Sequence, residues 1–184
     1  MTALWVIIII VVIVILIIAG YFNRLVSLKN RSEEAWSDID VQLKRRHDLI
    51  PNLVEIVKGY AKHEKDVFED VTKARSEAIS SKSMADKAKA ENQITETLKS
   101  LFAVAENYPN LKANENFIEL QREVTDTEDK VQAARRFYNA NVRDLSIAIE
   151  SFPSNVIANI FHYQKKELFE LSDVGEREPV EVKL

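Results

Sequence analysis

The sequence predicts an all-α protein, with an N-terminal transmembrane helix followed by an elongated antiparallel bundle of three long helices and one short helix. Three observations lead to this prediction. An unbroken apolar run opens the chain, and apolar residues recur at helical spacing through most of the rest. The third is composition, because 3 glycines and 4 prolines among 184 residues are too few for the frequent turns of a β-rich protein.

The apolar run covers Ala3–Phe22, and all 25 basic and 29 acidic residues lie after it. At about 1.5 Å per residue, a helix of this length spans roughly the 30 Å of a bilayer core. A cleaved signal peptide is the alternative, but it has a basic N-terminal region, a shorter apolar stretch and a small-residue cleavage site. The chain lacks a basic residue before the run, and Ile17-Ile18-Ala19-Gly20 is a poor cleavage site. We therefore expect residues 1–22 to remain as a transmembrane anchor.

The charges that flank the anchor predict its orientation. Arg24, Lys29 and Arg31 follow the apolar run before the first acidic residue, Glu33, whereas only the α-amino group precedes it. Basic flanks tend to stay on the cytoplasmic side of a membrane. We expect a single-pass protein of the cell membrane with a short N-terminus outside and a cytoplasmic body.

The first helix of the body is predicted from a stripe of apolar and small residues that runs from Leu25 to Ala78, with polar gaps at positions 46/47 and at Glu64. Proline has no N–H and clashes with the carbonyl four residues earlier, so Pro51 should kink or interrupt this helix near Leu49. Gly59 is a second weak point.

The remaining helices follow from the same spacing. A second helix is expected over Met84–Glu106, and Asn107-Tyr108-Pro109-Asn110 ends it. The third helix carries residues spaced by seven, which is typical of a bundle or coiled-coil face: Phe117, Val124, Val131, Tyr138 and Leu145, with Leu120, Thr127, Ala134, Asn141 and Ala148 in the complementary position. Pro153 should open a short helix over Ser154–Leu171. These helices define one domain, residues 23–171, and residues 172–184 are expected to form a flexible C-terminal tail.

One local run of residues is a candidate surface for a binding partner. Basic residues precede the proline and polar residues surround it: Lys44, Arg45, Arg46, His47, Asp48 and Asn52. Such a run fits docking of an acidic partner or of lipid headgroups, but it equally fits a solvated face beside a proline kink.

The chain offers few residues for catalysis. With no cysteine and 3 histidines, we expect no catalytic site, no metal and no cofactor. His63-Glu64 lacks the second histidine of a zinc protease helix. Arg135-Arg136-Phe137-Tyr138 fits a nucleic-acid stacking platform, but Tyr138 occupies the heptad seam and the protein is acidic overall, so we expect a core aromatic and no nucleic acid partner.

Four stretches, in order along the chain, resemble the bacterial LemA family: NRSEEAWSDIDVQLKRRHDLIPNLVEIVKGYAKHE at 30–64, FEDVTKAR at 68–75, AENYPNLKANENFIEL at 105–120 and RRFYNANVRDLSIAIESFPSNVIA at 135–158. The resemblance implies a single-span membrane protein with a short extracytoplasmic N-terminus and a helical-bundle body. One relative in magnetotactic bacteria is associated with the magnetosome membrane, and no catalytic residues carry over. The chain departs from the family at Leu145-Ser146, where Tyr-Asn is common, and at its C-terminal end, Glu181-Val182-Lys183-Leu184.

We therefore expect a membrane-anchored interaction or scaffold protein, whose partners are the membrane and other membrane-associated proteins, with homo-oligomers left open. The alternative is a membrane-tethered sensory or signal-transmitting domain that uses the helix kinked at Pro51 as a lever.

Overall fold

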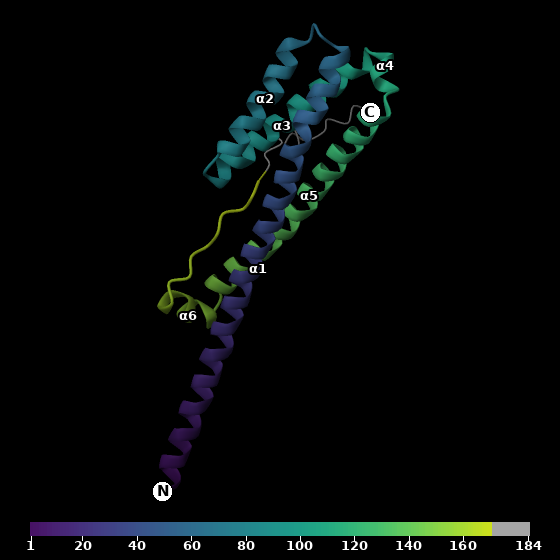
Figure 1. The fold of residues 1–184 in the computed structure, drawn as a ribbon. Helices are drawn as coiled ribbons and strands as arrows, with labels where there is room; N and C mark the ends of the chain where they lie inside the picture. Colours follow the sequence, from purple (N-terminus) through teal and green to yellow (C-terminus); the bar gives the residue numbers. More distant parts are fainter. Residues whose placement is uncertain (171–184) are drawn as a thin grey trace, which may run out of the picture. The chain divides into compact units, whose positions relative to one another are not determined.

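A computed structural model of the chain describes residues 1–170, and all regular structure in that range is helical. The six helices are α1 (Thr2–Tyr60), α2 (Lys65–Ser80), α3 (Met84–Glu106), α4 (Pro109–Lys112), α5 (Glu115–Glu150) and α6 (Ser154–Ile160) (Figure 1). The predicted all-α bundle is confirmed. The predicted tail, residues 172–184, lies outside the described residues.

The chain forms two compact units, and α1 and α5 each contribute to both. Unit 1 consists of Met1–Ile39 and Ala133–Leu168, so it contains the start of α1, the end of α5 and all of α6. Unit 2 contains Asp40–Gln132 and the described residues after Leu168. Its helices are the rest of α1, then α2, α3, α4 and the first half of α5.

The apolar run forms the beginning of α1. It is the one span among the described residues that is long and apolar enough to cross a membrane, and the most apolar stretch of it has no residue buried in the protein. Figure 1 shows this part of α1 extending past α6. A core helix of a soluble protein passes the same test of length and composition, but such a helix would be covered by other elements. The exposure therefore distinguishes the run from a core helix of a soluble protein.

The predicted first helix of the body is two helices. α1 continues without interruption through Pro51 and ends at Tyr60, and α2 starts at Lys65. Gly59 directly precedes the break, as expected of a weak helix former. The turn folds α2 back, so that Phe68, Val71 and their neighbours join the core cluster that α1 and α3 also build. A single long helix would have left this apolar stripe uncovered.

Polar side chains fix where the next helices begin. Ser83 caps α3 by accepting a hydrogen bond of 3.0 Å from the backbone N–H of Asp86. Asn114 does the same for α5, with its side-chain oxygen 3.0 Å from the N–H of Phe117. Such caps satisfy backbone donors that have no partner inside the helix. The predicted bounds of α3 agree with the structure.

The heptad prediction for α5 is confirmed as a buried seam. All five residues of the first series are at most 2% exposed, and most of the complementary series are also buried. Tyr138 is among them, and its ring lies 5.5 Å from that of Trp36 in unit 1. Trp36 itself is only half-buried.

The predicted helix Ser154–Leu171 is wrong beyond Ile160, where α6 ends. The N–H of His162 donates a hydrogen bond to the carbonyl of Asn159, and the N–H of Tyr163 donates one to the carbonyl of Ala158. His162 has φ of 55°, in the left-handed region that glycine usually occupies at a helix end. No glycine or proline marks this stop in the sequence, so the periodicity gave no sign of it.

Candidate functional site

The structure divides the six residues of the predicted partner surface into two groups. Lys44, Arg45, Asp48 and Asn52 are exposed, and we call these four the docking face. Arg46 and His47 are 2% and 7% exposed. The prediction that these two belong to a surface is wrong.

The helical register explains why Arg46 and His47 are buried. Leu43 precedes them by three or four residues and Ile50 follows by three or four, so all four lie on the core face of α1. The sequence stripe leaves positions 46 and 47 as polar gaps, and the basic run beside Pro51 places them on a surface. Charged side chains are rarely buried without a partner. The partners come from α3 and α5.

Five residues of unit 2 form a polar layer: Arg46, His47, Glu91, Thr95 and Glu128. The Arg46 guanidinium donates to the Thr95 hydroxyl at 2.8 Å and to the Glu128 carboxylate at 3.3 Å. It also pairs with the Glu91 carboxylate at 3.5 Å. The Nε2 atom of His47 lies 2.7 Å from the other oxygen of Glu91. The layer thus joins α1, α3 and α5.

The electrostatics of the layer depend on this pairing. Burial lowers the pKa of the Arg46 guanidinium, and the carboxylates of Glu128 and Glu91 act in the opposite direction. Because arginine starts from a very high pKa, Arg46 remains a cation at neutral pH. Among the described residues of the layer there is no serine or cysteine nucleophile to be activated by His47. The arrangement is suited to fixing the register of three helices rather than to group transfer.

Pro51 is accommodated in α1 by a side chain from α2. A proline at this position leaves the His47 carbonyl, four residues earlier, without its helical donor. The Nε–H of Arg75 donates to that carbonyl at 2.7 Å. Of the predicted kink or interruption at Pro51, the interruption is absent, and α2 supplies a donor for the carbonyl that the proline leaves free.

The docking face is held by exposed ion pairs. Lys44 pairs with Asp48 at 2.8 Å, and Arg45 lies 3.7 Å from Asp126 of α5. The hydrogen bond from Lys44 is the main cause that lowers the pKa of the Asp48 carboxyl. Exposed pairs of this kind are worth little energetically, so their charges can be exchanged for those of a partner.

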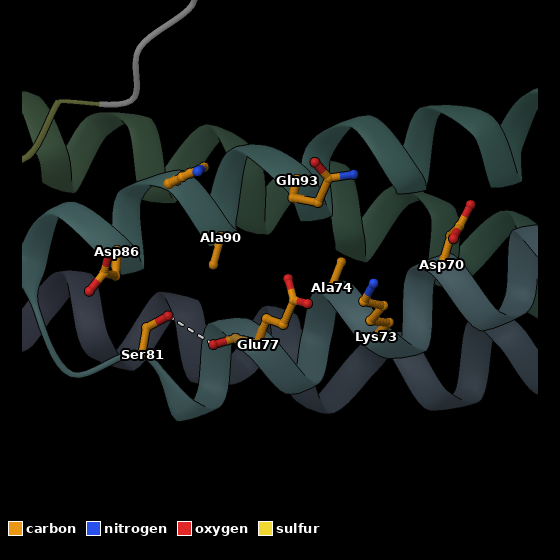
Figure 2. Close-up of a pocket in the computed structure, with 9 residues that line it drawn as sticks. Asp70, Lys73, Ala74, Glu77, Ser81, Asp86, Ala90 and Gln93 are labelled. Carbon is orange, nitrogen blue, oxygen red and sulfur yellow. Dashed lines mark hydrogen bonds between the residues drawn. The ribbon is translucent and has the colours of Figure 1, made fainter.

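A separate groove of about 460 Å³ lies between α2 and α3 (Figure 2). Ala74 and Ala90 form its floor, where small side chains let the two helices approach. Its walls mix acids with lysines, and Ser81 donates to the Glu77 carbonyl at 2.8 Å. Residues 1–170 contain no cluster of three or more His, Asp or Glu side chains able to hold a metal ion. The groove offers mixed charge and no convergent catalytic set.

Sequence reasoning missed four participants: Glu91, Thr95 and Glu128 of the polar layer, and Arg75. A weak signal existed for Glu91, which precedes Ile94 by three residues and so shares the apolar face of α3. Which acid meets which arginine depends on how the helices pack, and a single sequence does not give that.

A model of the LemA family matches residues 35–184. The chain belongs to the LemA family. The match contains the polar layer, Arg75 and the docking face, and it begins after the apolar run. The match therefore covers all of unit 2 and, within unit 1, residues 35–39 and 133–168, but it leaves residues 1–34 to be judged on their own properties.

Three relatives extend the comparison. Magnetosome protein MamQ 2 of Paramagnetospirillum magneticum is 23% identical over 181 residues, covering 84% of this LemA family chain and 66% of the relative. Magnetosome protein MamQ of Magnetospirillum gryphiswaldense is 21% identical with the same coverage. Protein LemA of Metamycoplasma hominis is 26% identical over 158 residues, covering 84% and 71%. The chain thus spans only 66% of the length of the magnetosome proteins it matches.

Proposed function

We propose that this LemA-type protein is a membrane-anchored scaffold that acts without catalysis and presents its docking face to other membrane-associated proteins. The observation that carries the proposal is the docking face itself. Its four residues stay exposed on α1, while their immediate neighbours Arg46 and His47 are tied into the polar layer. A polar surface on a helix held in fixed register is preorganised for recognition.

The membrane part of the proposal rests on the apolar run and on the relatives. The run has the length and composition of a single span and is exposed along its length. Two of the relatives are named as magnetosome proteins. We infer that the short N-terminus lies outside and that the chain after the run is cytoplasmic, because Arg24, Lys29 and Arg31 follow the run.

The orientation is tested by cysteine labelling, which suits a chain without natural cysteines. A cysteine introduced at Thr2 should react with a membrane-impermeant maleimide in intact cells. A cysteine at Ser100 should react only after the cells are opened. The reverse pattern would contradict the inferred orientation.

The docking face is tested by site-specific photo-cross-linking in cells. A photoreactive amino acid at Asn52 should give a discrete cross-linked species, whereas the same group at Ser100, exposed on α3, should give none. Reversing the charges of Lys44 and Arg45 to Glu should abolish the Asn52 product without changing the helical content. Equal products from positions 52 and 100, or products that survive the charge reversal, would overturn the docking face.

The sensory alternative required a kinked first helix. α1 is helical on both sides of Pro51, and Arg75 satisfies the carbonyl that the proline leaves free. No feature of the described residues favours a lever at this position over the scaffold role.

A further inference from the structure

Unit 1 exposes an apolar patch beside α6. Phe152 is 83% exposed and Ile160 is 64% exposed, and Val156 and Phe161 are each about half exposed. Val156 and Ile160 are four residues apart in α6, so they share one side of that helix. Phe152 lies just before the helix begins. Ser151–Phe161 contains no charged side chain. Contiguous exposed apolar surface of this kind indicates an interaction site.

The opposite side of α6 fixes the patch in place. Ile157 and Ala158 are buried and pack in the cluster that contains Leu25 of α1 and Leu145 of α5. Ser154 donates to the carbonyl of Ala148 at 2.6 Å. Because this face is already used by the core of unit 1, the patch cannot turn inward without dismantling it.

The patch adjoins the end of the apolar run. The Phe161 ring lies 4.6 Å from the ring of Phe22, the last residue of the run that we assign to the bilayer. Aromatic side chains at this point of a transmembrane helix sit at the headgroup level. Phe161 therefore lies within about one side-chain length of the depth of Phe22, which brings α6 close to the end of the run.

A basic groove lies next to the patch. Its volume is about 580 Å³, and it is lined by Phe22, Lys29, Leu145 and residues 161–166, with no carboxylate among them. Its lysines pair with acids outside the lining: Lys166 with Glu33 at 3.3 Å, Lys29 with Glu33 at 4.0 Å, and Lys165 with Glu150. The pairs of Lys29 and Lys165 are exposed, so they stabilise little and leave these two lysines able to turn to another anion. Lys166 is less exposed, at 27% of its side chain.

We propose that the apolar patch and this basic groove form a second membrane contact of the protein, in which the patch enters the boundary between headgroups and acyl chains and Lys29, Lys165 and Lys166 face anionic lipid headgroups. Apolar side chains beside lysines are the combination that binds membrane surfaces. The proposal rests on the assignment of the apolar run as a transmembrane anchor. Under this proposal, unit 1 contacts the bilayer through α6 as well as through the transmembrane part of α1.

The depth of the patch is tested on the full-length chain in vesicles. Single cysteines at Val156 and at Ile160 are labelled with an environment-sensitive fluorophore, with Ile13 as the anchor site and the exposed Ser37 as the aqueous control. The vesicles contain phosphatidylcholine with about a third phosphatidylglycerol, which imitates an anionic membrane. Labels at 156 and 160 should shift their emission to the blue and be quenched by lipids with a nitroxide near the headgroup. The label at 13 should be quenched by a nitroxide deep in the acyl chains, and the label at 37 by neither.

The outcomes separate the proposal from its premise. If the label at 13 is not in lipid, the transmembrane anchor fails. If 13 is in lipid while 156 and 160 resemble 37, the second contact is overturned and the patch is left for a protein partner.

The basic groove is tested with Lys29→Gln/Lys165→Gln/Lys166→Gln. In the parent chain, quenching of the label at 156 should be stronger in vesicles with phosphatidylglycerol than in phosphatidylcholine alone. This difference should disappear in the triple variant, with unchanged helical content measured by circular dichroism. Persistence of the full difference would overturn the role of the lysines.

Discussion

The two units differ in which residues they bury and which they leave exposed. Unit 2 buries charged side chains in the polar layer and gathers a large apolar cluster from α1, α2, α3, α4 and α5. Unit 1 has a cluster that includes Leu25, Leu145 and Ile157, the aromatic pair of Trp36 and Tyr138, and an apolar patch open to its surroundings. Unit 2 thus encloses its charged side chains among buried neighbours, whereas unit 1 leaves large apolar side chains exposed on α6.

The largest expected effect concerns the polar layer. Arg46→Ala should lower the free energy of unfolding by about 3 to 5 kcal/mol, because it leaves Glu91 buried without its cation. Arg45→Ala, on the adjacent exposed position, should change it by about 0.5 kcal/mol or less. Chemical denaturation of the full chain in detergent micelles, followed by circular dichroism, compares the two.

A double variant sharpens this result. In Arg46→Met/Glu91→Leu both buried charges are replaced by apolar side chains, which is often close to neutral. It should therefore be more stable than Arg46→Ala. Equal stability of Arg46→Ala and Arg45→Ala would instead mean that unit 2 does not depend on its charged layer.

The corresponding test in unit 1 is Tyr138→Ala. Loss of this buried ring, which packs on Trp36, should cost about 3 kcal/mol or somewhat more. The neighbouring Phe137 is 56% exposed, so Phe137→Ala should have a much smaller effect. Thermal unfolding of both variants makes the comparison, and matching midpoints would show that the aromatic pair is dispensable.

Pro51 and Arg75 are expected to be coupled. Arg75→Ala should cost about 1 to 3 kcal/mol, because it leaves the His47 carbonyl without a donor. In the background of Pro51→Ala the backbone N–H of residue 51 can bond that carbonyl, so the same substitution should cost less. A double-mutant cycle of unfolding free energies measures the difference. Strict additivity would show that Arg75 does not compensate for the proline.

The smallest effect is a dependence on alkaline pH. Burial is the main cause that raises the pKa of the Tyr138 hydroxyl above its ordinary value, and Glu167 adds to it. Above about pH 10 the unfolded state loses this proton while the folded state keeps it, so stability should fall as pH rises. Tyr138→Phe loses the 2.9 Å hydrogen bond to the Glu167 carbonyl, a cost of about 1 kcal/mol at neutral pH. The variant should show a smaller decline above pH 10, and an identical decline would assign it to other groups.

The sequence predicted those features that depend on one helix at a time. The seven-residue spacing of Phe117 to Leu145 marked the buried seam of α5, and the end of α3 followed from Asn107-Tyr108-Pro109-Asn110. Features that need two helices were missed. From the sequence alone, Pro51 predicts a break in the helix, because the donor that Arg75 provides to the His47 carbonyl comes from another helix. In the same way Arg46 is expected on a surface, because its partners Glu91 and Glu128 lie on other helices. The left-handed backbone of His162 had no sequence signal.

The uninterrupted passage of α1 from the apolar run into unit 1 has a mechanical consequence. No hinge separates the span from the part of unit 1 that packs on α1 as far as Ile39. When a bilayer is thinner than a hydrophobic helix, the helix responds by tilting. A tilt of this anchor is then a tilt of unit 1. Because α6 lies on one side of α1, tilting toward that side and tilting away from it should differ in free energy. Bilayer thickness would in this way set the angle between unit 1 and the membrane plane.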